Sequence, residues 1–193
     1  VDQVLGKQES FGNYRGWSVQ INRSTGTIGL VLRSVLATNE MSAYSTSSVT
    51  DDTWKHVLFT YDGSSLHTGI HLYVDGVVAS MTGGAFLTST IVNSVAFMLA
   101  SMNAGGDWYT GSLDEVGIWD KELSPTEVAE VYNGGALPVD LTALSTKANL
   151  IGWWPMGEGD VYPTLTDRST GGHNGTMTNM ESTDIVDRAL VGT

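Results

Sequence analysis

The chain of 193 residues carries 21 acidic and 9 basic residues, a formal net charge of −12, and no cysteine. An acidic surface of this kind repels nucleic acid and anionic membranes, so neither is expected as a partner. No apolar run approaches the roughly 18 residues that a transmembrane helix needs, so membrane insertion is not expected either. The chain begins at Val1 without a signal-like stretch, which suggests a processed or trimmed product whose preceding residues are not visible.

Short segments with an alternating apolar pattern predict β-strands through the first half of the chain. Val4 and Leu5 indicate a short opening strand. Residues 16–33 are typical of a hairpin, because apolar and polar residues alternate on both sides of a turn at 24–26. The Ser/Thr-rich residues 34–53 are expected to form a loop with a strand near Met41 to Tyr44.

A second hairpin is predicted further along. Residues 54–61 form an apolar strand that ends in a turn at 62–63, and residues 70–80 contain the next two strands. Between those two, Asp75 and Gly76 are a strong two-residue turn signal. A loop at 83–93, a buried strand at 95–100 and a Gly-containing loop at 101–107 complete this part.

Residues 111–135, GSLDEVGIWDKELSPTEVAEVYNGG, combine a strand with the one convincing helix of the chain. The signals for a helix start are all present: Ser124 as N-cap, Pro125 at the first helical position and Glu127 closing a capping box. Apolar residues follow at i, i+3 and i+4 spacing, and a glycine pair at 134–135 ends the helix.

The C-terminal part adds a strand at 150–155, a long polar loop at 157–172 and a last strand at 174–177. About eleven short antiparallel strands with one helix predict an all-β fold, a two-sheet antiparallel jelly-roll sandwich with one short helix.

Two motifs carry a resemblance to a known family. The first is WKHV from Trp54, then DG at 62–63, then LYVDG over 72–76; the second is G-x-L-D-E…W…L-S-P…E-V…Y over 111–132. In this order they resemble the central hairpin and the closing motif of laminin-G-like domains. The resemblance covers about residues 16–135 and implies two curved antiparallel sheets, as in concanavalin A-type lectins and pentraxins.

The opening strand of that family is displaced in this chain. Family members usually begin with apolar-x-Trp-x-Phe-Asp-Glu and an Asp-x-Ser-Gly-x-x-Asn-Gly loop, and similar patterns occur here at 150–158 and 167–177. The first strand is therefore expected to come from the C-terminal segment. This segment could complete its own sandwich, complete a neighbouring subunit's, or begin a truncated second domain. Completion is favoured, because an unpaired half-domain would expose sheet edges. The expected divisions are a main sandwich at 1–135, a connector at 136–149, a strand-loop-strand at 150–178 and a tail at 179–193.

The resemblance also implies a calcium ion at one rim of the sandwich. An Asp of the closing motif and groups of the Asp-x-Ser-Gly loop hold it in the family, and the matching residues here are Asp114, Asp167 and Ser169. Hard oxygen ligands suit calcium. The alternative is that Asp114 caps a turn and Asp167 is a solvated residue of an Asx-turn.

Catalysis is not expected. The related glucanases carry paired acidic residues on one strand, but Asp114 and Glu115 are adjacent and would point to opposite faces of a strand. Glu158 and Asp160 lie in a loop. The histidines at 67 and 71 straddle a turn and a strand, where their spacing does not favour a zinc pair.

Sugar sites in such folds use exposed aromatic rings to stack on the sugar, with amides and carboxylates for its hydroxyls. The candidates are Asn103, Asp107, Trp108 and Tyr109 on the Gly-containing loop, with Tyr14 and Tyr44 in addition. The alternative is that Trp108 and Tyr109 start a strand and close one end of the sandwich. The remaining tryptophans, Trp17, Trp54, Trp119, Trp153 and Trp154, are expected in the core, and one of the adjacent pair is expected to face outward or into a partner.

Two functions follow from the resemblance. The first is a non-catalytic module on an extracellular or particle surface that binds carbohydrate, with structural calcium. The second is a structural virion protein, such as a capsid decoration, spike or fibre component, that assembles as a homo-oligomer with neighbouring subunits through strand exchange. A third interpretation is a glycan-active enzyme, but the chain lacks the paired acidic motif of the related glucanases.

Overall fold

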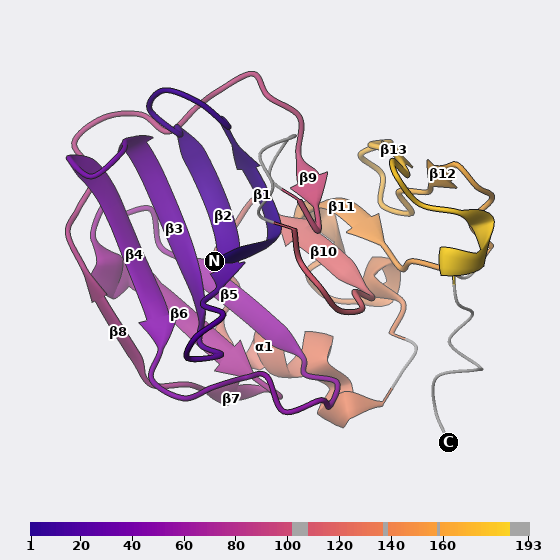
Figure 1. The fold of residues 1–193 in the computed structure, drawn as a ribbon. Helices are drawn as coiled ribbons and strands as arrows, with labels where there is room; N and C mark the ends of the chain where they lie inside the picture. Colours follow the sequence, from indigo (N-terminus) through magenta and orange to yellow (C-terminus); the bar gives the residue numbers. More distant parts are fainter. Residues whose placement is uncertain (102–107, 137–138, 158, 186–193) are drawn as a thin grey trace. The chain divides into compact units, whose positions relative to one another are not determined.

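The computed structural model describes residues 1–101, 108–136, 139–157 and 159–185 (Figure 1). The chain folds into two compact units, Val1–Gly111 and Ser112–Thr193. Among the described residues no helix has the length and apolar character needed to cross a membrane.

The first unit is built on a six-stranded antiparallel sheet in the order β8-β4-β3-β2-β1-β9 (Figure 1). Its strands are β1 (Asp2–Gln8), β2 (Gly16–Ile21), β3 (Ile28–Val35), β4 (Asn39–Ser45), β8 (Met81–Gly84) and β9 (Met98–Leu99). The first four strands follow one another in the chain and pair with their neighbours, so local turns build most of this sheet.

The two faces of this sheet differ in character because side chains alternate along each strand. On one face Val19, Leu30 and Ala43 form a cross-strand row, flanked by further apolar residues. Ala43 is almost completely buried there. The opposite face is polar; on it the Tyr44 hydroxyl donates a hydrogen bond of 3.1 Å to Gln20 Oε1. The apolar face supplies the core of this unit.

A three-stranded antiparallel sheet completes the first unit, in the order β5-β6-β7. Its strands are β5 (Val57–Tyr61), β6 (Ile70–Val74) and β7 (Val77–Val78). Ile70 and Leu72 are buried, whereas both valines of β7 are exposed at the edge.

The second unit contains two strand pairs and the α-helix. β10 (Val116–Trp119) pairs with β11 (Leu150–Trp154), and β12 (Thr164–Leu165) pairs with β13 (Gly175–Thr176), both antiparallel. The helix α1 (Pro125–Tyr132) begins with the predicted capping box, in which Ser124 N donates to Glu127 Oε2 over 2.9 Å and Glu127 N donates to Ser124 Oγ over 3.4 Å. The short 3-10 helices of the chain are η1 (His67–Gly69), η2 (Asn133–Gly135), η3 (Leu141–Ala143), η4 (Lys147–Asn149) and η5 (Ser182–Asp184).

The architecture confirms the predicted fold class, since it is mostly β, with several antiparallel sheets and one short α-helix among the described residues. β11 pairs with β10 of the same chain, but whether it supplies the missing first strand of the sandwich stays a prediction. The expected division of the chain at residue 135 also stays a prediction; the compact units divide between Gly111 and Ser112.

Four local expectations were wrong. Strand β8 extends to Gly84, inside the segment 83–93 that was expected to be a loop, and the strand expected at 95–100 is reduced to β9. Trp54 is 54% exposed rather than in the core. Asp114 and Glu115 precede β10 instead of lying on it, and Glu115 has a left-handed backbone with φ 53°.

Candidate functional site

The candidate site lies in the first unit, where the chain leaves β8. β8 pairs with β4 from Met81 opposite Ser45 to Gly84 opposite Ser42, and the same register would place Phe86 opposite Glu40. The ladder ends at Gly84 instead.

The turn away from β4 is made at Ala85, which has φ 63°. Phe86 then forms an antiparallel bridge with Leu66, and Leu87 N donates to Ser65 O over 2.9 Å. The Ala85 carbonyl accepts a hydrogen bond of 3.1 Å from His67 Nδ1, which fixes the departing chain. The edge of the sheet therefore splits, with β4 on one side and residues 85–88 on the other.

Glycine explains why the split begins where it does. A Cβ atom at Gly83 would lie 2.5 Å from Ser42 O and 3.1 Å from Ala43 Cα, so only glycine allows β8 to approach β4 this closely. Strand pairing is held up to Gly84, and the change of direction follows at the next residue.

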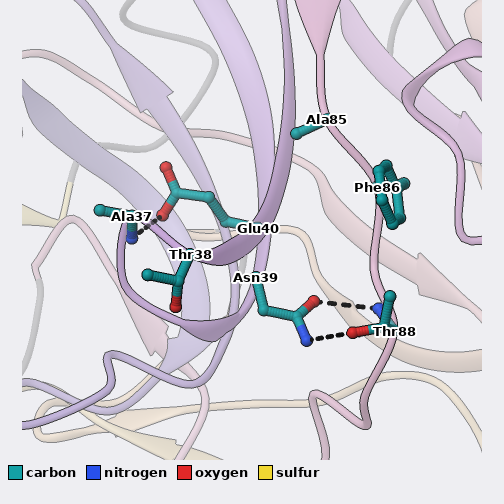
Figure 2. Close-up of a pocket in the computed structure, with 7 residues that line it drawn as sticks. All are labelled: Ala37, Thr38, Asn39, Glu40, Ala85, Phe86 and Thr88. Carbon is teal, nitrogen blue, oxygen red and sulfur yellow. Dashed lines mark hydrogen bonds between the residues drawn. The ribbon is translucent and has the colours of Figure 1, made fainter.

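The far end of the split is closed by a side-chain clamp. Asn39 Nδ2 donates to Thr88 Oγ1 over 2.7 Å, and Thr88 N donates to Asn39 Oδ1 over 3.0 Å. Both polar ends of the Asn39 amide are therefore engaged with one residue. Figure 2 shows this pair of hydrogen bonds along one side of the hollow, with Phe86 and Glu40 on either side of it.

Glu40 forms the wall on the β4 side. Its Oε2 accepts a hydrogen bond of 2.5 Å from Arg33 Nε and one of 3.1 Å from Ala37 N. Ala37 has φ 61° and belongs to the turn between β3 and β4, so the carboxylate holds this turn in place. Glu40 Oε1 accepts no hydrogen bond from the described residues, and the side chain keeps 31% of its surface exposed.

The resulting hollow, which we call the split-edge pocket, has a volume of about 340 Å³. It is lined by Ala37, Thr38, Asn39, Glu40, Ala85, Phe86 and Thr88 (Figure 2). Phe86 is 57% exposed, and its ring lies beside the hydroxyl and carboxylate groups of the pocket. An aromatic face and a few polar groups around one hollow are suited to a small polar ligand with an apolar face.

With the fold and this geometry described, comparison with known proteins decides the family. A family model described as the concanavalin A-like lectin/glucanases superfamily, Laminin_G_3, matches residues 2–129. The chain belongs to this superfamily. Among curated proteins no match is found.

The predicted sugar-binding residues that the structure describes, Trp108, Tyr109, Tyr14 and Tyr44, do not line the split-edge pocket. Trp108 bridges Gln3 of β1, and Tyr109 N donates to Ala100 O beside β9, so both lie near the edge of the six-stranded sheet opposite to the pocket. Trp108 is half exposed, as a stacking residue would be. Burial raises the pKa of Tyr109.

Tyr44, another predicted sugar contact, belongs to the same row of the sheet as Trp108: its hydroxyl donates to Gln20, and Gln20 pairs with Gln3, which bridges Trp108. The Tyr44 ring covers Gly29 on the polar face of the sheet, where burial raises the pKa of the Tyr44 hydroxyl. Tyr14 has a left-handed backbone and its carbonyl accepts from Gln8 Nε2. Asn103 and Asp107 lie outside the described residues. A sugar contact by any of the six stays a prediction.

Asp167, a predicted calcium ligand, instead organises its own loop through backbone hydrogen bonds. Its Oδ1 accepts from Trp153 N over 2.9 Å and from Ser169 N over 2.8 Å, and its Oδ2 accepts from His173 N over 2.7 Å. The residue is an Asx-turn residue, as the alternative interpretation held, but it is buried rather than solvated. Burial raises the pKa of Asp167, yet the N–H groups of Trp153 and His173 outweigh this and hold it below 3.8.

The other two predicted calcium ligands also make local hydrogen bonds. Asp114 Oδ1 accepts from Glu115 N over 2.9 Å, and Ser169 Oγ accepts from Gly171 N over 3.0 Å. No group of three or more His, Asp or Glu residues able to hold a metal ion occurs in the part of the chain that the structure describes. Calcium prefers six to eight oxygen ligands, so these residues do not form a fitting donor set as they stand. A lower unfolding temperature on addition of a chelator would support the calcium prediction.

The adjacent tryptophans are both buried, contrary to the expectation that one faces outward or into a partner. Trp153 Nε1 donates to Glu115 Oε2 over 2.7 Å, and Trp154 Nε1 donates to His173 O over 3.0 Å. Each indole N–H therefore has a hydrogen-bond acceptor. The two tryptophan side chains, which point to opposite faces of β11, can for this reason both be buried. The acceptor of Trp153 is one of the acidic residues considered for catalysis; Glu158, another of them, lies outside the described residues.

The residues of the split-edge pocket were missed by the sequence reasoning. Residues 83–93 were expected to form a loop, and Phe86 carries no signal within it. A usable sign was the run Gly83-Gly84-Ala85, in which small residues permit close strand approach followed by a change of direction.

Proposed function

We propose that the protein is a non-catalytic carbohydrate-binding module of an extracellular or particle surface, and that the split-edge pocket is its sugar site. The observation that carries this proposal is the exposed ring of Phe86 across a hollow of about 340 Å³ from the Glu40 carboxylate. This volume lies in the range of about 300–1,000 Å³ that small-molecule sites span. The ring can stack on the apolar face of a pyranose while oxygen atoms meet its hydroxyls.

A binding role fits the pocket better than hydrolysis. Glycoside hydrolysis uses two carboxyl groups on either side of the bond that breaks. Glu40 is the single carboxylate among the lining residues, and its Oε2 is engaged by Arg33 and Ala37. The superfamily contains both lectins and glucanases, and this pocket supports the lectin-like alternative.

The structural alternative, a virion component that exchanges strands, depends on the displaced first strand. β11 pairs with β10 of its own chain, and this pairing needs no neighbouring subunit. Strand exchange stays a prediction, and a measurement of native mass tests it.

The test of the sugar site compares two phenylalanines of the same unit. The wild type is screened against a glycan array, and its best ligand is then titrated into the Phe86→Ala and Phe11→Ala variants. Phe11 is 77% exposed and does not line the pocket, so it is a matched control for the loss of an exposed ring. We expect Phe86→Ala to weaken binding by about tenfold or more, as for loss of a central aromatic contact, and Phe11→Ala to bind as the wild type does. Equal binding by all three proteins would place the sugar elsewhere, and no array signal would contradict the function itself.

A further inference from the structure

We propose that the split-edge pocket selects neutral sugars and discriminates against their uronic acid and sulfated counterparts. The inference rests on the proposed function and adds the chemical class of the ligand. It is carried by the balance of donors, acceptors and charges among the lining residues.

The lining offers one carboxylate, which only accepts, and the hydroxyl groups of Thr38 and Thr88, which can donate or accept. Both ends of the Asn39 amide are used by Thr88, and the Ala85 carbonyl is used by His67, so these groups hold the pocket rather than the ligand. Glu40 Oε1 accepts no hydrogen bond from the described residues, and a carboxylate oxygen only accepts. A ligand that donates hydrogen bonds, as sugar hydroxyls do, complements this wall.

No positive charge lines the pocket to receive an anion. The seven lining residues include no Lys, Arg or His. Arg33, which contacts the lining through Glu40, has its Nε on Glu40 Oε2 at 2.5 Å and only 14% of its side chain exposed, and the His67 ring contacts the lining through its Nδ1 on the Ala85 carbonyl. A ligand carboxylate or sulfate would therefore approach the Glu40 carboxylate with no free cation among the lining residues to offset the repulsion.

The same ion pair argues against a cationic ligand. Arg33 already occupies Glu40 Oε2, so an ammonium group would have to share this carboxylate with a cation that is in place. The ring face of Phe86 carries partial negative charge, which suits the C–H face of a pyranose and gives no attraction to an anion. The net charge of −12 adds a long-range repulsion of anionic polymers.

The experiment uses pairs of probes that differ mainly in charge. We would titrate the full chain with methyl-esterified against free oligogalacturonates, with mannan oligosaccharides against oligomannuronates, and with desulfated against native carrageenan oligosaccharides. In each pair that binds, we expect the neutral member to bind at least about tenfold more tightly at low salt, which is 1.4 kcal/mol. We expect Glu40→Gln to reduce this ratio, because the amide removes the repulsion while it keeps the shape of the wall.

Each outcome separates the selectivity from the underlying function. If the acidic member of a pair binds as tightly as the neutral one and Phe86→Ala abolishes that binding, the pocket is a sugar site and the selectivity is wrong. If the neutral member binds preferentially but Phe86→Ala and Phe11→Ala bind equally, the selectivity belongs to another surface and the inference fails for this pocket. If no probe of any pair and no glycan of the array binds the wild type, the proposed function fails and the inference with it. Unfolding curves of all variants establish that each is folded.

Discussion

At the scale of single residues, the Asp167 carboxylate holds in place a loop of the second unit that has no regular secondary structure. Its two oxygens accept the N–H groups of Trp153, Ser169 and His173, and so tie strand β11 to both ends of a loop. A buried carboxylate in this setting is stabilised by several donors at once, and removing its charge leaves the donors without an adequate acceptor.

We expect Asp167→Asn to lower the free energy of unfolding by about 1–3 kcal/mol, the usual cost of leaving a buried polar group unsatisfied. The amide keeps one oxygen for Trp153 and Ser169 but turns an NH2 group toward the N–H of His173. Chemical denaturation at neutral pH measures the difference. Asp140→Asn is the matched control, because Asp140 is an exposed cap of η3 and Asn caps equally well. A variant as stable as the control would show that these hydrogen bonds contribute little.

Acid should remove the same contribution in the wild type. The pKa of Asp167 is lowered on folding, so its stabilising effect is present above the unfolded value of 3.8 and is lost as the pH falls through the folded value. We expect the difference in stability between the wild type and Asp167→Asn to be constant near neutral pH and to shrink below about pH 4. Denaturation midpoints measured from pH 7 to pH 2 give this difference. A difference that grows in acid would contradict the assignment.

At the scale of elements, α1 shows what local sequence determines. Ser124, Pro125 and Glu127 predicted the start of the helix at its observed residue, because a capping box involves only groups three residues apart. Lys121 Nζ adds an ion pair with Glu127 Oε1 at 2.5 Å. The side-chain hydrogen bond from Lys121, together with those from Ser124, lowers the pKa of Glu127 to about 2.

We expect Lys121→Met to raise the pKa of Glu127 from about 2 toward 4.5, because Lys121 is the largest of the groups that lower it. The capping bonds from Ser124 remain, so the pKa should stop short of the ordinary value. A carbon-detected NMR titration of the Glu127 carboxyl group gives both values. Lys147→Met is a suitable control, since Lys147 lies in η4 and has no described contact with Glu127. An unchanged pKa in Lys121→Met would assign the shift to the cap alone.

Strand β8 and the split-edge pocket show what local sequence does not determine. Met81 to Gly84 have no apolar alternation, and they form a strand because β4 offers a free edge far away in the chain. The pocket depends on where that pairing stops and on the bridge between Phe86 and Leu66, which are twenty residues apart. Hairpins joined by short turns were predicted well, since their partners are neighbours in sequence. The described residues among those predicted to bind sugar, Trp108, Tyr109, Tyr14 and Tyr44, do not line this pocket.

Glycines in the β10–β11 pair determine how its tryptophans pack. The Trp154 ring lies over Gly152 and the Trp119 ring lies over Gly117, each on its own strand; a Cβ atom at Gly152 would come within 2.5 Å of the Trp154 ring. We expect Gly152→Ala to lower the free energy of unfolding by about 1–3 kcal/mol through overpacking, measured by urea denaturation. Gly84→Ala is the control within a strand, because a Cβ atom there meets nothing within 4 Å. Similar stabilities for the two variants would show that the Trp154 ring moves aside freely.

At the scale of the whole molecule, the question is whether one chain completes its own fold. Residues Val116–Trp119 pair with Leu150–Trp154 of the same chain, and the described part of the 30 residues between them contains α1 and the three 3-10 helices η2, η3 and η4. A strand that already has its partner in cis needs none from a neighbour. The acidic surface, with a net charge of −12, also makes close approach of two copies unfavourable at low salt.

We therefore expect native mass spectrometry to find a monomer of 20.6 kDa, and a mixture of isotope-labelled and unlabelled chains refolded together to form no mixed species. Strand exchange would instead give a multiple of that mass, with mixed species in refolded samples and none in samples mixed after folding, because exchanged strands separate only on unfolding. A multimer that dissociates on dilution and shows no exchange of strands would indicate association through the surfaces of folded monomers. A persistent trimer or ring with exchanged β11 would contradict the pairing in cis and would make the structural virion role the leading proposal.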